Sequence, residues 1–230
     1  MSDDTSTPSG AEAATERLRI TFFCGSVIGY RGDPAALPTR ALADALGRRG
    51  HIVRLTEERM NAAFTQTLRE VGGNAVRTIH DTFPHMQIHA WEARQGARLL
   101  EWLTRELALV DVAVVVDGAG DLLTEWVAMI ERRRLVRVYL HWGNQPISAE
   151  RAAAMHLDQF DLVLSAAAGA LPYSLAPQDL AAGIAMPGID VGSLADSGAV
   201  AQAFERMIEA HRQQARTHIT VQNGVVPPDQ

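Results

Sequence analysis

The sequence lacks several features that would place it in common functional classes. Its 230 residues include a single cysteine, Cys24, so no disulfide can form within the chain, and we expect Cys24 to be a packing residue. No apolar stretch approaches the length of a membrane span, and the N-terminus has no basic segment followed by an apolar one. These absences predict a cytoplasmic protein without a membrane span.

Positive charge is also scarce. Lys and Arg number 21 against 27 Asp and Glu, so the formal net charge is −6. The dense basic clusters lie at 48–49 and 132–134, which we expect to be helix C-termini, where Arg complements the helix dipole. This balance argues against the basic stripe of a general nucleic-acid binder, and no nucleic-acid partner is expected.

The sequence does contain a regular alternation of apolar strand-like runs and amphipathic segments. The predicted strands are 18–24, 51–56, 86–89, 111–116, 136–141, 161–165 and, at an edge of the sheet, 183–186. The predicted helices are 38–49, 60–71, 91–109, 121–133, 148–155 and 199–215. This order predicts an α/β fold: a doubly wound, mostly parallel, Rossmann-like sheet of about six to seven strands in a single domain.

The composition also suggests where the domain begins and ends. Residues 1–16 are rich in Ser, Thr, Asp, Ala and Gly and are expected to be a disordered tail. We assign 17–192 to the Rossmann-like domain, 193–218 to a C-terminal helix that packs on it, and 219–230 to a frayed tail.

The segment 111–126 marks the first candidate site. Its apolar run suits a strand buried on both faces of a parallel sheet, and an Asp-Gly-Ala-Gly turn leads from it into a helix with Asp121 as the expected N-cap. Ligands of open α/β sheets bind beyond the carboxyl ends of the strands, so Asp117, Gly118, Gly120 and Asp121 are candidate ligand residues. Asp117 is either a catalytic or sugar-binding carboxylate or a cap of its own turn. We expect this strand to lie between the strands at 18–24 and 136–141, in the sheet order 3-2-1-4-5-6.

The loop after the first strand contains glycines at wide spacing. Its backbone N–H groups would approach a phosphate or sugar, although the same glycines would also serve tight turns alone. The candidate ligand residues in this loop are Gly25, Ser26, Gly29, Arg31 and Gly32. The spacing is not the dinucleotide fingerprint G-x-G-x-x-G, so NAD is disfavoured even though Glu57 follows the second strand, and no cofactor is expected.

His141 is the candidate general base. It ends a predicted strand on the ligand side, where an imidazole would act as a base or bind a hydroxyl, or would instead donate to a nearby backbone carbonyl. Trp142 and Asn144 follow it in the chain, and they are candidates for stacking on a sugar ring and for hydrogen bonding to a sugar.

A second group of histidines raises the question of a metal. His80, Asp81, His85 and His89 lie close in sequence, but Pro84 interrupts them and only His85 and His89 have a helical i, i+4 spacing. Ordinary loop histidines explain the segment better than a metal site, so no metal is expected.

Four segments resemble, in order, the N-terminal half of the two-Rossmann-domain (type-B fold) glycosyltransferases. They are 41–56 (ALADALGRRGHIVRLT), 111–121 (DVAVVVDGAGD), 136–146 (VRVYLHWGNQP), and 160–165 (FDLVLS) joined to 187–190 (PGID). The match covers 17–192, and the family's second domain, which holds the nucleotide-sugar, has no counterpart after Asp190, where one helix of useful length remains. The resemblance therefore implies a lone acceptor-side domain.

What this resemblance implies is hexosyl-type glycosyl transfer to an acceptor hydroxyl, with His141 or Asp117 as the base, or binding of a glycan or nucleotide-sugar. Activity would need a separate donor-binding subunit, or the chain would be an inactive relative. The alternative is a non-catalytic small-ligand-binding or regulatory module. We also expect self-association or a partner through apolar residues exposed beside the site: Trp142, Ile147, Leu171 and Tyr173.

Overall fold

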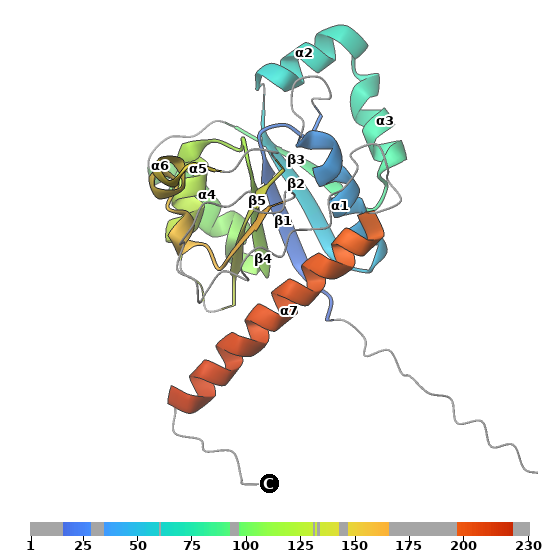
Figure 1. Ribbon diagram of the computed structural model, residues 1–230. Helices are drawn as coiled ribbons and strands as arrows, with labels where there is room; N and C mark the ends of the chain where they lie inside the picture. Colours follow the sequence, from blue (N-terminus) through green and yellow to red (C-terminus); the bar gives the residue numbers. More distant parts are fainter. Residues whose placement is uncertain are drawn as a thin grey trace, which may run out of the picture.

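In the part of the chain that the structure describes, six strands form one sheet in which every neighbouring pair is parallel. The computed structural model describes residues 16–28, 35–59, 61–92, 97–130, 132, 134–142, 147–165 and 197–222. The strands are β1 (Arg19–Cys24), β2 (Ile52–Glu58), β3 (Gln87–Trp91), β4 (Val112–Val116), β5 (Val136–His141) and β6 (Leu162–Ser165). Their order is β3-β2-β1-β4-β5-β6 (Figure 1), which confirms the predicted order and the place of β4 between β1 and β5.

Helices cover both faces of this sheet (Figure 1). The described helices are α1 (Ala36–Arg48), α2 (Ala62–Val71), α3 (Asn74–Thr82), α4 (Ala97–Glu106), α5 (Asp121–Met129), α6 (Ala149–Ala154) and α7 (Ser197–Gln222), with 3₁₀ turns η1 (Leu107–Leu109) and η2 (Leu157–Gln159). One core cluster joins the sheet to α1, α3 and α7, and a second joins it to α4, α5 and α6. The fold is therefore α/β, doubly wound and Rossmann-like.

Strand alternation explains how one apolar run serves both layers. All five residues of β4 are buried: Val112, Val114 and Val116 belong to the first cluster, and Ala113 and Val115 to the second. Successive side chains of a strand point to opposite faces, so an unbroken apolar strand is what a sheet covered on both sides requires. Because of the same alternation, adjacent residues at the end of a strand direct their side chains to opposite faces of the sheet.

Several element boundaries differ from the prediction. Gly72 ends α2 with φ +71, and a new helix, α3, begins at Asn74 where the sequence was not expected to be helical; Pro84 follows the end of that helix and does not interrupt it. Trp91 belongs to β3 and stacks on Trp102 of α4, with ring centroids 4.9 Å apart. α1 begins two residues before Pro38.

The start and end of α5 also correct the prediction. Gly120 occupies the N-cap position, and Asp121 is the first helical residue, so it contributes its charge to the helix N-terminus instead of a side-chain cap. α5 ends at Met129, and the guanidinium of Arg132 donates to the carbonyls of Leu107 and Ala108 in η1. Arg132 thus donates hydrogen bonds at the C-terminus of η1. The sequence pattern predicts it instead at the C-terminus of a helix at 121–133.

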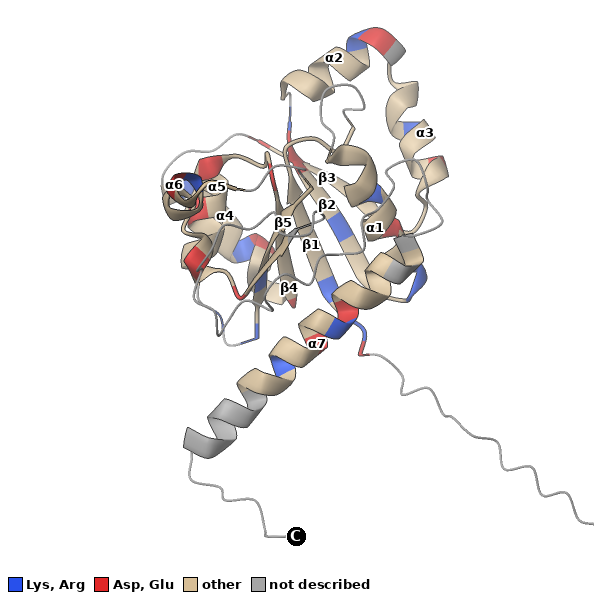
Figure 2. Cartoon of the chain, viewed as in Figure 1, with Lys and Arg blue, Asp and Glu red and all other residues tan. Residues whose placement is uncertain are grey.

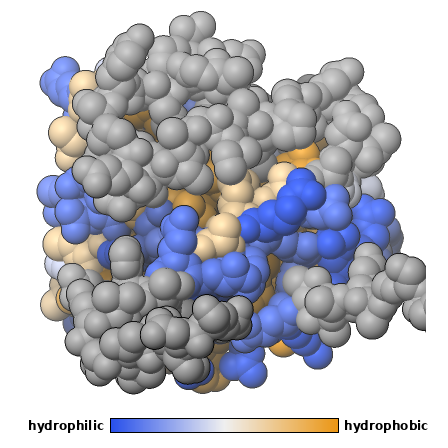
Figure 3. All heavy atoms as spheres, turned by 60° about the horizontal axis from the view of Figure 1, so that its bottom comes forward, coloured by the Kyte–Doolittle hydropathy of each residue, from blue (hydrophilic) through white to orange (hydrophobic). Residues whose placement is uncertain are grey.

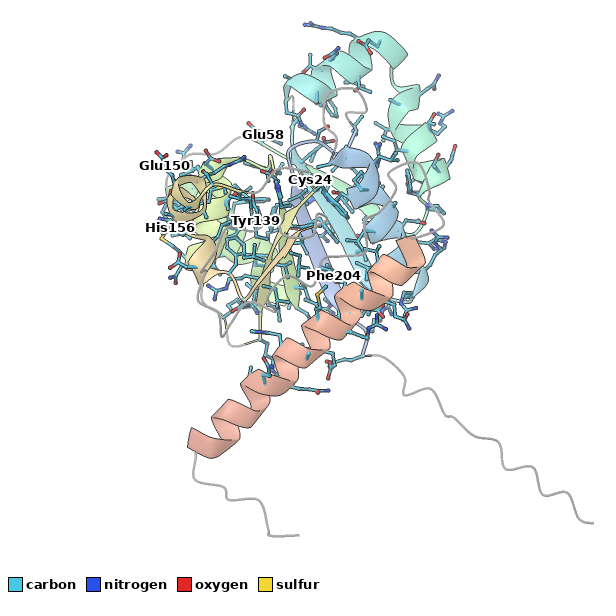
Figure 4. The ribbon with its side chains drawn as sticks, in the orientation of Figure 1. Cys24, Glu58, Tyr139, Glu150, His156 and Phe204 are labelled. Carbon is cyan, nitrogen blue, oxygen red and sulfur yellow. The ribbon has the colours of Figure 1, made fainter. Side chains whose placement is uncertain are left out.

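The long helix α7 packs beside α1, on the face of the sheet that the first core cluster covers. Its buried apolar residues, among those whose side chains are described, are Val200, Ala201, Phe204, Met207 and Ile208. Phe204 points toward the sheet (Figure 4) and stacks on Phe22 of β1, with ring centroids 6.4 Å apart. The predicted C-terminal helix is confirmed, and it extends through Gln222, beyond the expected end. The tail 1–15 and the expected edge strand 183–186 lie outside the described residues.

A polar clasp fastens α7 to the amino end of β2. Glu205 accepts hydrogen bonds from Arg49 at 2.6 and 2.7 Å and from His51 Nε2 at 2.9 Å. Because His51 Nδ1 accepts the backbone N–H of Leu18 at 3.1 Å, the imidazole is neutral and carries its proton on Nε2. Burial acts to raise the pKa of Glu205, but the hydrogen bonds from Arg49 and His51 outweigh it and hold the pKa below its ordinary value of 4.5.

This clasp predicts a pH-dependent stability. A carboxylate whose pKa is lower in the folded state stabilises the fold above its unfolded pKa, and that contribution is lost as the pH falls through the folded value. The free energy of unfolding should therefore decrease below about pH 4.5, the ordinary pKa of a glutamate. Glu205→Gln should lower it by about 1.5–3 kcal/mol at pH 7 and flatten this decrease. Urea unfolding at several pH values measures both effects, and an unchanged pH profile in the variant would assign the acid sensitivity to other groups.

Candidate functional site

The two residues proposed from sequence as candidate bases lie side by side. Asp117 follows the last residue of β4, and His141 is the last residue of the adjacent strand β5. The His141 Nδ1 atom lies 2.8 Å from Asp117 Oδ2. A carboxylate only accepts hydrogen bonds, so Nδ1–H donates to it, and the lone pair of the imidazole is then on Nε2. The arrangement is that of a base oriented by a carboxylate.

Two further side chains complete the cluster, and the sequence had not indicated either. The Tyr139 hydroxyl donates to Asp117 Oδ1 at 3.1 Å, and Arg151 of α6 donates to the same oxygen at 2.8 Å. Tyr139 and His141 are two residues apart in β5 and so share one face of the sheet, the face on which α6 lies (Figure 4). The contacts of the Asp117 carboxylate are thus with side chains of β5 and α6, which argues against the alternative that it caps its own turn.

The electrostatics of the cluster keep Asp117 ionised. The hydrogen bond from His141 is the largest cause that lowers the pKa of Asp117; burial opposes it, and the charge of Arg151 assists it. Burial is also the main cause that raises the pKa of Tyr139, and the neighbouring charge of Asp117 adds to it. Tyr139 therefore remains a protonated donor at neutral pH. The result is a fixed negative charge beneath the imidazole, which stabilises the imidazolium form.

Trp142 lies on the other side of the sheet from His141. Its indole packs against the first core cluster, and its Nε1–H donates to Thr39 Oγ1 of α1 at 2.8 Å. Adjacent residues at a strand end emerge on opposite faces, so an aromatic one position after His141 is directed away from the Asp117–His141 pair. The role of Trp142 in stacking on a sugar stays a prediction, but its place is beside α1.

Four apolar residues beside the site were expected to be exposed, and this expectation is wrong for Ile147. Ile147 is buried, with 3% of its surface exposed, and Trp142 is half-buried; Leu171 and Tyr173 lie outside the described residues. The exposed large hydrophobic residues in the described part are Leu37, Val76, Leu109, Leu122 and Met129. On the face in Figure 3, the described residues are mainly hydrophilic around smaller hydrophobic areas. Self-association remains a prediction.

The loops after β1 and β4 meet at the point where the strand order reverses. A Cβ atom at Gly25 would lie 2.2 Å from the carbonyl oxygen of Gly118, so only glycine permits this approach. Gly118 and Gly120 have φ values of +91° and +103°, which explains both glycines in the turn. Ser26, the residue after Gly25, is also buried. Three further candidates of the loop after β1, Gly29, Arg31 and Gly32, lie outside the described residues, as does Asn144 in the loop after β5.

Gly25→Ala should therefore disturb both loops at once. The added methyl group meets backbone atoms, which cannot rotate away, so we expect a loss of about 1–3 kcal/mol in the free energy of unfolding. Gly73→Ala is the matched control, because its φ is −63° and a Cβ there meets nothing within 4 Å. Thermal or urea unfolding compares the two variants. Equal stabilities would show that the loops separate readily.

Glu57, the acidic residue considered above in connection with NAD, lies within β2 and contacts the loop after β1. It is fully buried, and its Oε2 atom accepts the backbone N–H of Val27 at 2.8 Å and that of Ile28 at 3.4 Å. Its Oε1 atom is buried without a hydrogen-bond partner in the described part of the chain. Burial is the main cause that raises the pKa of Glu57. This carboxyl group holds the start of the glycine loop against β2.

The described residues contain no group of three or more His, Cys, Asp or Glu side chains able to hold a metal ion. His80, Asp81 and His85 lie on or just after α3, and His89 lies on the edge strand β3. Cys24 is buried near the carboxyl end of β1 (Figure 4). Positive and negative side chains are interspersed over the described elements (Figure 2). Of the helices described, none has the length and apolar character needed to cross a membrane.

No protein-family model matches the chain, and no curated protein matches it. A solved structure titled "AtPrR2 in apo form" aligns with 65% of this chain and 48% of its own length, at 12% sequence identity and a TM-score of 0.39. The aligned region thus spans about half of that structure, and a likeness at this level carries no argument about function.

Proposed function

We propose that this protein is glycosyltransferase-like and that His141 is the general base that activates an acceptor hydroxyl. The observation that carries the proposal is the 2.8 Å hydrogen bond between His141 and Asp117 at the carboxyl ends of adjacent parallel strands. Carboxyl ends of strands are where ligands of this fold class bind. The resemblance of 17–192 to the acceptor-side domain of type-B-fold glycosyltransferases supports glycosyl transfer as the reaction.

In the proposed mechanism, the acceptor hydroxyl hydrogen-bonds to His141 Nε2. As its oxygen attacks the anomeric carbon of the donor sugar, the proton moves to Nε2 and the bond from that carbon to the nucleotide phosphate breaks. Asp117 stabilises the imidazolium ion that forms, because its charge lies against Nδ1–H. The proton is taken up by His141, the sugar is transferred to the acceptor oxygen and the nucleotide phosphate leaves. The proposed step uses no metal or cofactor.

Tyr139 and Arg151 act through Asp117. Both donate to Oδ1, which leaves Oδ2 to His141, so they fix the carboxylate in the orientation that holds the imidazole. These are positioning residues, and they raise the rate by keeping the base in one geometry. Arg151 is half-exposed at the edge of the cluster, so its positive charge would also attract an arriving anionic donor.

The donor would be presented by a separate subunit or by a second copy of the chain. Glycosyl transfer requires the donor beside the acceptor and the exclusion of water from between them, which in the family is achieved between two domains.

A ligand screen followed by a transfer assay tests the function. Thermal shift of the purified protein against nucleotides, nucleotide sugars and NAD(P) should single out a nucleotide sugar or a glycosyl acceptor. A ligand at about 100 times its Kd adds roughly 2.7 kcal/mol of stability. Transfer of labelled sugar from that donor would support the proposal. Specific binding without transfer, with or without candidate partners, would favour a small-ligand-binding module, and stabilisation by NAD(P) alone would contradict both.

A further inference from the structure

A pocket lies at the amino ends of β1 and β2, at the end of the sheet opposite to Asp117 and His141. It has a volume of about 330 Å³ and is enclosed by these two strands, by the last residues of α4 and by η1 with the residue after it. Sites for small molecules occupy about 300–1,000 Å³, so the pocket has room for a small ligand.

The floor of the pocket is formed by two cross-strand pairs. Arg19 of β1 lies opposite Ile52 of β2, and Thr21 lies opposite Arg54. Side chains two positions apart on a strand share one face of the sheet, and Phe23, the next in this series on β1, belongs to the second core cluster. The floor is therefore on the face that α4 covers.

Thr21 is the buried polar group of this floor. Only 3% of its surface is exposed, it lines the pocket, and its hydroxyl has no hydrogen bond with any residue that the structure describes. The hydroxyl of Thr56, which is also buried, donates to the carbonyl of Phe22 at 2.5 Å. Buried hydroxyl groups as a rule have a hydrogen-bond partner, so Thr21 marks where a polar group of a ligand would lie.

The charges around the pocket leave one cation without a counter-charge. Arg54 Nη1 lies 2.5 Å from Glu106 Oε1, which neutralises it. Arg105 Nη2 lies 3.4 Å from Glu101 Oε1, and both of these side chains are largely exposed, so their ion pair separates readily. The side chain of Arg19 forms no hydrogen bond or ion pair within the described ranges. A ligand therefore meets the guanidinium of Arg19 as an available cation.

Two carboxylates beside the pocket limit the negative charge that a ligand can carry. Asp111 Oδ2 accepts the backbone N–H of Arg19 at 2.8 Å, and Glu106 lines the pocket itself. Both repel an anion, and they repel a dianion about twice as strongly as a monoanion. The arrangement therefore favours a single negative charge.

We propose that this pocket binds a small organic monoanion: a carboxylate attached to an apolar body. The guanidinium of Arg19 binds the carboxylate, the Thr21 hydroxyl donates to it, and the apolar body lies against Ile52 and Leu109. Leu109 is 72% exposed, and a ligand that covers it removes apolar surface from water. The site is independent of the proposed glycosyl transfer, because it lies at the other end of the sheet.

The test compares two probes of similar shape that differ in charge: 3-phenylpropionate and 3-phenylpropionamide. Calorimetry and NMR titration of the full chain should show saturable binding of the acid and at least about tenfold weaker binding of the amide. Arg19→Gln should weaken binding of the acid at least about tenfold, and Thr21→Val about threefold to tenfold. Arg69→Gln is the control, because Arg69 is exposed on α2 and does not line the pocket.

Thr21→Val keeps the proposal testable if Arg19→Gln does not fold, since threonine and valine have similar shapes. Equal affinity for the amide, unchanged affinity in either variant, or no saturable binding up to the solubility of the acid would each overturn the proposal. A loss in Arg69→Gln as large as that in Arg19→Gln would show non-specific attraction and would also overturn it. So would tighter binding of 2-phenylethyl phosphate, which is a dianion at about pH 8.

Discussion

Asp117→Asn is expected to lower the rate of glycosyl transfer by about 10²- to 10⁴-fold while the protein stays folded. The amide has the shape of the carboxylate but no charge to stabilise the imidazolium. Its NH₂ group can also face Nδ1, and the imidazole then carries its proton on Nε2, where it cannot accept one from the substrate. His141→Gln should have a loss of similar size, and the double variant little more, because the two residues act as a unit.

The conservative substitution matters because alanine would test two things at once. Truncating either side chain to alanine would lower stability as well as remove the charge or the base. The structure shows His141 buried, with 5% of its surface exposed, and Asp117 accepting from Tyr139 and Arg151 as well. Asp117→Ala leaves buried donors without an acceptor, at about 1–3 kcal/mol for each such group.

Kinetics in the transfer assay, with circular dichroism as the check on folding, measures the effect of Asp117→Asn. Glu150→Gln is the control, because Glu150 is exposed and precedes Arg151 on α6. If Asp117→Asn keeps the wild-type rate, or if Glu150→Gln loses as much, the pair is structural and the base lies elsewhere.

Much of the framework could be predicted because it depends on local patterns. β4 is an unbroken apolar run buried on both faces, and β5 is buried along most of its length although Arg137 interrupts its apolar residues. The proximity of Asp117 and His141 also followed from the sequence, because the carboxyl ends of parallel strands meet at one edge of the sheet. The predicted helix 148–155 starts with Ser148, a residue type favoured at helix N-caps, and its side chain accepts the backbone N–H of Arg151 at 3.2 Å.

The remainder depends on contacts that no local pattern encodes. Tyr139 lies within a strand and is indistinguishable from a core aromatic, and Arg151 reaches Asp117 from a helix 34 residues further along the chain. Trp142 was grouped with His141 because they are adjacent in sequence, yet adjacency at a strand end places side chains on opposite faces.

Phe204→Ala should lower the free energy of unfolding by about 3–5 kcal/mol, the range for removing a buried aromatic ring. Phe204 is fully buried and packs on Phe22 of β1, so the deletion leaves a cavity between α7 and the sheet that rigid strands cannot fill. Gln202→Ala, an exposed position on the same helix, should change stability by less than about 0.5 kcal/mol. Urea unfolding followed by circular dichroism measures both variants.

The same variant tests whether the clasp at Glu205 depends on the packing of α7. If the cavity loosens the helix, Glu205 no longer holds Arg49 and His51, and the loss of stability below about pH 4.5 should shrink together with the stability at pH 7. The effects of Phe204→Ala and Glu205→Gln should then be less than additive, because the second removes contacts that the first has already weakened. If the losses of stability in Phe204→Ala and Glu205→Gln are additive, the contacts of Glu205 form independently of the packing of Phe204. If Phe204→Ala lowers the free energy of unfolding as little as Gln202→Ala does, α7 is not part of the folded core.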